Sequence, residues 1–288
     1  MADNVQSQTA TDSDGLLRRA CLFGIQIDAI GMQQAVTRIR DWIRERPITC
    51  RFVVTPNVDH IVMLQGNGDF LKAYRQADLV LADGWPVVWA SRTAGQALPE
   101  LVPGSDLVPA LFLAASTAFR SAGESGDGSD GKPLRVFLLG AAPGVAARAA
   151  RRIESDWPGV QVVCQYSPPL GFENDDAETA FILERIAEAR PDVLVVGLGA
   201  PKQELWVHRH QTRIHASVAL CVGATIDFLA GQRQRAPLWM RRCGIEWLHR
   251  MLSEPRRLIR RYLRGAWVFP RLVWKEWRVR NHRNNVNS

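Results

Sequence analysis

The chain has 288 residues, of which 47% are hydrophobic and 23% charged, and its formal net charge is +7 at pH 7. This length and hydrophobic content suffice for a substantial core, in one large α/β domain or in a domain with an appendage, and we favour the second. The composition excludes a disulfide framework, a zinc site and a membrane span, because the five cysteines show no C-x-x-C spacing and no run approaches about 18 apolar residues.

The first half of the chain predicts a βαβα order. Residues 1–20 are polar and acidic, contain no apolar signal segment, and are expected to form a disordered tail. Beyond them we predict a strand at 51–54, a helix at 58–75, a strand at 79–82 and a helical stretch at 107–119. Residues 121–132 are rich in Gly, Ser and Asp and are predicted to form a loop too polar to pack.

The second half continues the alternation of strands and helices. The predicted strands are 135–139, 160–164, 193–196 and 217–222, and the predicted helices between them are 145–156, 177–189 and 203–210. Short Val/Leu-rich strands that alternate with helices indicate an α/β fold, with a mostly parallel sheet and Rossmann-like βα units. We assign residues 21–232 to this core, including the polar loop.

The C-terminal segment differs in charge from the rest. Residues 233–280 contain fourteen Arg/Lys, three Asp/Glu and five of the ten tryptophans, whereas residues 1–232 contain 26 acidic and 21 basic side chains. On a helical wheel Arg250, Arg257, Arg261 and Arg264 share one face. We therefore predict that residues 233–288 form a basic, amphipathic helical appendage suited to an anionic membrane surface, with a solvated face on a helix packed to its own domain as the alternative.

Polar residues and glycines follow the predicted strands, where ligands of parallel sheets bind. These strand-end segments are Thr55–His60, Asp83–Pro86, Gly140–Gly144, Gly197–Glu204 and Gly223–Asp227. Glycines there allow a backbone to approach a diphosphate, and helix N-termini supply N–H groups to hold it.

Each segment also has a purely structural interpretation. The glycines and Asp83 could form ordinary turns, and Thr55 and Asn57 could cap the following helix. His60 is expected to be a packed or capping residue. Gln203 and Glu204 could be first-turn residues favoured by the helix dipole. The ordered combination of segments is more specific than any one of them.

Together these segments resemble the WecG/TagA/CpsF glycosyltransferases, glycosyltransferase family twenty-six. The resemblance runs from about Leu22 to Tyr262. Its departures are the acidic tail, the loop at 121–132 and the Trp-rich extension after Tyr262. The segments that carry it are TPNVDH, ADLVLADGWPVVWASR, RVFLLGAAPGVA, VVGLGAPKQELW, VGATIDFLAG and RAPLWMRRCGIEWLHRMLSEPRRLIRRY.

The resemblance implies an inverting transfer of a sugar from a UDP-sugar donor to an undecaprenyl-diphosphate-linked sugar acceptor in bacterial surface polysaccharide biosynthesis. It implies a peripheral protein on the cytoplasmic face of the bacterial inner membrane, acting without a cofactor. Asp83 matches the catalytic carboxylate, and Arg250, Arg257 and Arg260 match arginines that bind the diphosphate. The expected substrate-binding residues are Thr55, Asn57, Gly84, Gly140, Gly199, Gln203, Glu204 and Asp227.

The chemistry of the residues agrees with this expectation. Displacement at an anomeric carbon needs a base for the acceptor hydroxyl, and Asp83 can serve. The only Asp-x-Asp string, of the kind that recruits a divalent ion, is Asp12-Ser13-Asp14 in the tail. We therefore expect arginines, rather than a metal, to stabilise the leaving diphosphate.

Two other function classes stay open at the level of sequence. A nucleic-acid-binding protein would explain the basic segment but leaves the strand-end residues without a role, so we expect no nucleic-acid partner. A Rossmann-type nucleotide-sugar oxidoreductase or epimerase would explain the glycines, but no Tyr-x-x-x-Lys is present. The oligomeric state is also open, with a homo-oligomer as one alternative.

Overall fold

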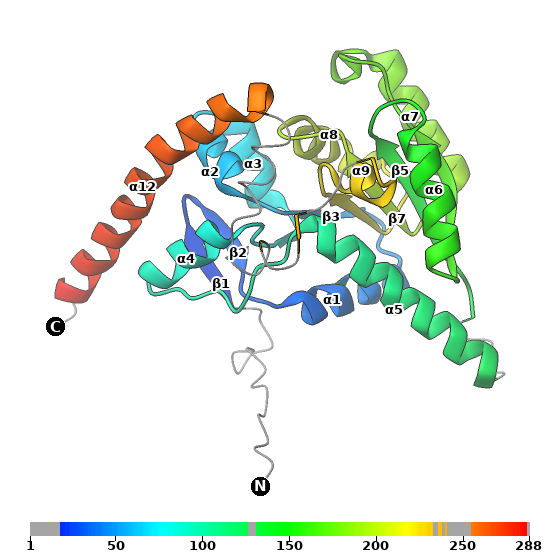
Figure 1. Ribbon diagram of the computed structural model, residues 1–288, viewed down its shortest axis with the longest axis horizontal. Helices are drawn as coiled ribbons and strands as arrows, with labels where there is room; N and C mark the ends of the chain where they lie inside the picture. The colour runs from blue at the N-terminus through cyan, green and yellow to red at the C-terminus, as the bar shows by residue number, and fades with distance from the viewer. Residues whose placement is uncertain (1–17, 126–130, 233–235, 238–239, 241–254, 287–288) are drawn as a thin grey trace, which may run out of the picture.

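The computed structural model describes residues 18–125, 131–232, 236–237, 240 and 255–286, and Figure 1 shows their arrangement. The strands are β1 (Arg19–Leu22), β2 (Ile25–Asp28), β3 (Arg51–Val54), β4 (Leu79–Val80), β5 (Leu134–Gly140), β6 (Val160–Tyr166), β7 (Val193–Gly197) and β8 (Val218–Cys221). The α-helices are α1 (Met32–Glu45), α2 (Val58–Leu64), α3 (Gly68–Gln76), α4 (Trp85–Thr93), α5 (Gly104–Ser125), α6 (Val145–Asp156), α7 (Asp176–Ala189), α8 (Lys202–His210), α9 (Thr225–Leu229) and α12 (Pro255–Val286). Two short 3₁₀ turns, η1 (Phe172–Asn174) and η2 (Gln211–Arg213), follow β6 and α8.

The centre of the described structure is a six-stranded sheet in the order β4-β3-β8-β7-β5-β6. All of its neighbouring strands run parallel. The predicted α/β fold with a parallel sheet is therefore confirmed. Because the strands are parallel, the carboxyl ends of all six lie at the same edge, and the segments that follow them can meet there.

Helices cover both faces of this sheet. On one face lie α2, α3, α4, α7 and α8, and on the other α1, α5, α6 and α9. Alternate residues of each strand enter the two cores; in β7, Leu194 and Val196 face the first, and Val193 and Val195 face the second. A sheet buried on both faces explains why the strands are almost continuously apolar in sequence.

A hairpin of β1 and β2 lies beside β4, the outermost strand at one side of the sheet. β4 forms only two residue pairs with β3, and strands β1 and β2 pair antiparallel beside it. The buried carboxylate of Asp28 accepts hydrogen bonds from the Val80 backbone N–H and from Arg19 Nε, each at 2.8 Å. This side chain gives the short edge strand a hydrogen-bond partner that a further strand would otherwise supply.

The helix predicted over residues 58–75 is wrong as one element, because the structure divides it into α2 and α3. The side-chain oxygen of Asn67 accepts a hydrogen bond from the Phe70 backbone N–H at 3.0 Å and caps a new helix. An N-cap side chain stabilises a fresh helix start, so the direction of the chain changes here.

Several other boundaries differ from the sequence prediction. The loop predicted at 121–132 begins too early, since α5 continues through Ser125 with its apolar residues, such as Leu111 and Phe112, buried in the core. Strand β1 also starts at Arg19, inside the predicted tail, and residues 1–17 lie outside the described part of the chain.

Helix α4 follows Gly84 directly and was not among the predicted helices. It has Pro86 in its first turn, where a missing N–H costs no hydrogen bond.

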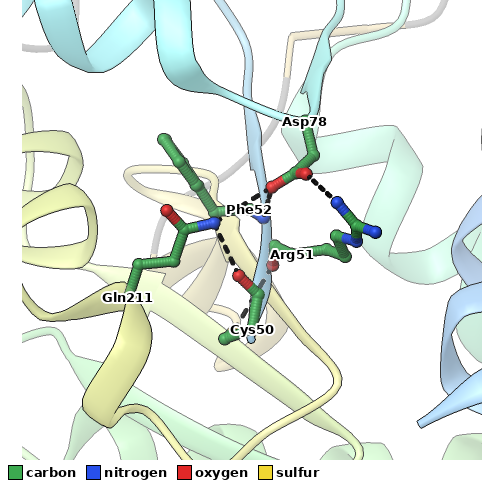
Figure 2. A network of polar contacts seen from close by, with 5 residues as sticks. All are labelled: Cys50, Arg51, Phe52, Asp78 and Gln211. Carbon is green, nitrogen blue, oxygen red and sulfur yellow. Dashed lines mark hydrogen bonds and ion pairs between the residues drawn. The ribbon is translucent and has the colours of Figure 1, made fainter. Parts of the chain in front are cut away.

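A polar network joins the chain at the amino-terminal ends of β3 and β4, opposite the carboxyl ends of the strands (Figure 2). Asp78 accepts hydrogen bonds from Arg51 Nη1 at 2.7 Å and from the Phe52 backbone N–H at 2.9 Å. Gln211 Nε2 donates to Asp78 at 3.2 Å and to the Cys50 carbonyl at 2.8 Å. This network ties the start of β3 to the segments before β4 and after α8, away from the strand ends where ligands bind.

Helix α12, which spans Pro255–Val286, runs along one side of the molecule over α2 and α4 (Figure 1). Phe269 and Val273 are buried in the core, and the ring of Phe269 lies 5.6 Å from that of Phe23. Glu276 accepts a hydrogen bond from the Phe23 backbone N–H at 2.9 Å. The C-terminal helix is therefore packed onto the α/β core.

Candidate active site

Asp83 lies at the edge where the strands of the sheet end. Its backbone N–H donates to the carbonyl of Pro56 at 2.9 Å, so the segment after β4 is fixed against the segment after β3. This places Asp83 beside the Thr55–Asn57 segment. The Asp83 side chain is half-buried, and the next residue, Gly84, has φ +125°, a conformation that favours glycine.

Thr55 and Asn57 differ in what their side chains do. Asn57 is the N-cap of α2, and its side-chain oxygen accepts from the backbone N–H groups of Asp59 and His60 at 3.0 and 3.2 Å. Thr55 is buried, with 3% of its surface exposed. The capping interpretation is thus confirmed for Asn57. The packed interpretation of His60 is also confirmed, because its Nδ1 lies 2.7 Å from the Tyr74 hydroxyl in the interior.

Three glycines line the ends of β5, β7 and β8. A Cβ at Gly140 would lie 2.5 Å from the Gly197 carbonyl oxygen, and one at Gly197 would lie 2.9 Å from the Gly223 carbonyl oxygen. Both distances are too short for a side chain, so this row of turns requires glycine. Gly199, with φ +80° and open space around its Cα, continues the row. The strand ends therefore pack closely together, with Gly140 buried and with Gly197, Gly199 and Gly223 partly exposed, where a phosphate group can approach the backbone.

Gln203 and Glu204 lie behind these glycine turns rather than in them. Gln203 Oε1 accepts from the Gly223 backbone N–H at 3.2 Å, and its Nε2 donates to Glu204 Oε1 at 2.9 Å. Their exposed fractions are 1% and 0%. Both side chains are thus buried in the described structure, and the hydrogen bonds of Gln203 join α8 to the turn after β8.

The carboxyl of Glu204, which accepts a hydrogen bond from Gln203, is fully buried in the described structure. Burial raises its pKa from 4.5 to about 7, and Oε2 has no hydrogen-bond partner in the described structure. Burial also raises the pKa of Tyr74 well above its usual value, and the charge of Glu204 adds to this effect. In the folded protein Glu204 is therefore mostly protonated below pH 7, where an ordinary Glu is already ionised.

This shift predicts a stability that depends on pH. Between pH 4.5 and 7 the unfolded chain ionises Glu204 while the folded protein keeps the proton, so the free energy of unfolding falls as pH rises and levels off above 7. The loss is on the order of 3 kcal/mol. Glu204→Gln, which cannot ionise, should match the wild type at pH 4.5 and exceed its stability at pH 7.5 in urea unfolding. Equal stabilities at both pH values would show that Glu204 ionises freely in the folded state.

The amino terminus of α5 joins the same edge, which the sequence analysis did not predict. The Val102 backbone N–H donates to the Ala82 carbonyl at 2.8 Å, one residue before Asp83. Two residues later, a Cβ at Gly104 would lie 2.7 Å from Val222 at the end of β8. This 22-residue helix therefore starts beside the strand ends, with Gly104 and Ser105 buried, and the positive end of its dipole lies at this edge. The Pro-Gly-Ser sequence at 103–105 is a signal for this helix start.

The remaining predicted residues are placed less completely. Asp227 is half-buried in the first turn of α9, after Gly223. Arg250 lies outside the described residues, and Arg257 and Arg260 lie in the first two turns of α12. Among the residues that the structure describes, no group of three or more His, Cys, Asp or Glu side chains could hold a metal ion.

Comparison with protein families gives a match over nearly the whole chain. The profile described as "Glycosyl transferase WecG/TagA/CpsF family" matches residues 20–283. It includes most of the Trp-rich segment after Tyr262, so the sequence analysis is wrong to place that segment outside the resemblance.

Curated relatives of known name cover most of the chain as well. A protein from Staphylococcus aureus (strain MW2), named N-acetylglucosaminyldiphosphoundecaprenol N-acetyl-beta-D-mannosaminyltransferase, is 28% identical over 237 residues, which cover 82% of this chain and 85% of the relative. A protein of the same name from Bacillus spizizenii is 32% identical over 206 residues, which cover 72% of each chain.

Proposed function

This chain belongs to the WecG/TagA/CpsF family of glycosyltransferases, and we propose that it transfers a sugar from a UDP-sugar to a sugar carried on undecaprenyl diphosphate. The names of its relatives support this acceptor class, since both specify N-acetylglucosaminyldiphosphoundecaprenol. The observation that carries the proposal is the position of Asp83. Asp83 is a half-buried residue whose backbone N–H is hydrogen-bonded to the Thr55–Asn57 segment, at the same ends of the strands as the glycine turns.

The proposed reaction is a single displacement. The ionised Asp83 takes the proton of an acceptor hydroxyl, and the acceptor oxygen attacks the anomeric carbon of the donor. The bond from that carbon to the UDP oxygen breaks on the opposite side, and UDP leaves with the electron pair. The configuration at the anomeric carbon is therefore inverted.

The leaving diphosphate needs positive charge and hydrogen-bond donors. The partly exposed glycines after β7 and β8 leave room for it, and the positive end of the α5 dipole lies at the same edge. We assign the remaining charge to Arg250, Arg257 and Arg260, so that residues 233–288 complete the active site. Each charge-assisted hydrogen bond to the phosphate contributes about 1.5 to 3 kcal/mol.

The outer face of α12 supports association with an anionic membrane. Opposite the buried Phe269, Trp267 and Trp274 are 69% and 56% exposed. The guanidinium of Arg271 lies 3.8 Å from the ring centre of Trp267, and that of Arg278 lies 4.4 Å from Trp274. Indoles and cations on one face suit the headgroup region of a lipid bilayer. In the described residues no helix has the length and apolarity needed to span a membrane.

Removing two of these cations should weaken membrane binding measurably. Arg271→Ala/Arg278→Ala is expected to reduce association with vesicles that contain anionic lipid by roughly 30-fold, because each cation near the surface contributes about 1 kcal/mol. The readout is co-sedimentation with vesicles. Arg151→Ala, on the exposed surface of α6, is the matched control and should bind like the wild type. Equal binding by all three proteins would remove this face of α12 from the membrane interaction.

A direct assay tests the proposed function. Purified protein is incubated with a short-chain polyprenyl-diphosphate N-acetylglucosamine and a panel of UDP-sugars that includes UDP-N-acetylmannosamine. Release of UDP together with a new disaccharide on the lipid supports the proposal. Failure of every donor to transfer to this acceptor, under conditions that support a known family member, would contradict it.

A further inference from the structure

A large aromatic side chain is exposed directly beside the proposed base. Trp85 is the first residue of α4 and lies two positions after Asp83, with 42% of its surface exposed. Two residues of chain span at most about 7 Å, so the Cα atoms of Asp83 and Trp85 lie within that distance of each other. The neighbouring Val87 and Val88 are fully buried and fix the helix that carries it.

The indole is also held by a neighbouring cation. The guanidinium carbon of Arg92 lies 5.1 Å from the centre of the Trp85 ring, two turns later on the same helix. Such a cation–π contact orients the ring. An exposed indole held in this way differs from the freely rotating side chain of an ordinary surface residue, and it offers a rigid apolar surface to a ligand.

The position of β4 in the sheet indicates which substrate would meet this ring. β4 is the edge strand, with β7 and β5 three and four strands away. At about 4.8 Å per strand, the glycine turns after β7 and β5 lie roughly 14 and 19 Å from the end of β4. These two turns are therefore farther from Trp85 than Asp83 is, whereas the Gly223 turn after β8 is two strands from β4 and the amino terminus of α5 is tied to Ala82. The group beside Asp83 is the sugar that loses a proton, which must approach a general base to within about 3 Å.

We propose that Trp85 is a stacking platform for the sugar ring of the acceptor, which it orients so that the reacting hydroxyl faces Asp83. The inference rests on the proposed function and names one of its specificity-determining residues. The apolar C–H face of a pyranose ring lies against the indole, while its hydroxyl groups at the rim remain available to Asp83. Arg92 is a positioning residue that acts through Trp85.

Steady-state kinetics with a short-chain, water-soluble acceptor test the proposal. Trp85→Ala should raise the KM for the acceptor about 2- to 13-fold, the range expected for loss of one stacking contact, and leave the KM for the donor unchanged. Trp85→Phe, which keeps an aromatic face, should recover most of the loss. Trp89→Ala is the matched control, since Trp89 is 50% exposed one turn further along α4 and should leave both KM values unchanged. Thermal melting confirms that each variant is folded.

Each alternative role of Trp85 gives a different result. An unchanged KM for the acceptor in Trp85→Ala would overturn the proposal while the proposed function stands. A higher KM for the donor alone would assign the ring to the nucleotide and overturn it as well. Weaker vesicle binding with unchanged soluble kinetics would make Trp85 a lipid anchor. If the wild type transfers no sugar, the proposed function fails, and calorimetric binding of the same acceptor to wild type and Trp85→Ala decides the role of Trp85.

Discussion

Replacing Asp83 by Asn is expected to lower turnover by about 10² to 10⁴-fold, the usual contribution of a positioned general base. Asn has the same shape but cannot take the proton of the acceptor hydroxyl. The backbone hydrogen bond from residue 83 to Pro56 does not involve the side chain, so the variant should keep the fold and bind the donor normally. Single-turnover measurements with saturating donor and acceptor isolate this chemical step.

Asp69→Asn is a suitable control for that experiment. Asp69 is exposed in the first turn of α3, so the substitution makes the same chemical change away from the strand ends. It should leave turnover at the wild-type level. Turnover near the wild-type level in Asp83→Asn would remove Asp83 from the mechanism, even if the protein proves to be an active glycosyltransferase.

The second large effect is expected from the arginines that we assign to the diphosphate. Arg250→Ala, Arg257→Ala and Arg260→Ala should each lower kcat about 10- to 100-fold, because a charge-assisted hydrogen bond to the leaving group is lost. The loss should appear with a water-soluble acceptor, where membrane binding has no influence. Excess EDTA should have little effect on the wild type, since no metal ion is assigned to the leaving group.

Arg271 supplies the matched control. It lies fourteen residues after Arg257 on α12, about 21 Å along the helix axis, and it is exposed above Trp267. Arg271→Ala should weaken vesicle binding and keep the wild-type turnover of the water-soluble acceptor. Arg257→Ala should lower that turnover and keep wild-type vesicle binding. The catalytic assignment of the arginines is wrong if their substitution reduces vesicle binding alone. If EDTA removes the activity and Mn²⁺ restores it, a metal ion rather than the arginines stabilises the leaving diphosphate.

Much of the fold could be predicted from sequence because its strands are buried on both faces. Strand β3 and helix α6 have the predicted bounds, since Val-rich runs and 3.6-residue periods mark them clearly. Helix α1 carried an equally strong signal, with Ala35, Ile39 and Trp42 on one buried face, and the sequence analysis did not use it. The split between α2 and α3 depended on one side-chain cap at Asn67, which a helical period does not reveal.

The site could be predicted only in part. Sequence shows which residues follow each strand, but it does not show which of their side chains are exposed and which are buried. The segment after β4 is exposed enough for chemistry, whereas Gln203 and Glu204 point into the core. A signal for this was present, since Gln203, Trp206 and Val207 follow the i, i+3, i+4 pattern of a buried helix face. The contribution of α5 could not be predicted, because its amino terminus reaches the strand ends through the Gly104–Val222 contact, which joins residues far apart in sequence.

The configuration of the product tests the central claim most directly. Nuclear magnetic resonance of the disaccharide formed from an α-linked UDP-sugar and the short-chain acceptor reports the stereochemistry at the transferred anomeric carbon. A single displacement assisted by Asp83 predicts a β-linked product from the wild type. The Asp83→Asn variant should form the same β-linked product, at a rate lowered by the factor given above. An α-linked product would mean retention of configuration, and the proposed mechanism would then be wrong.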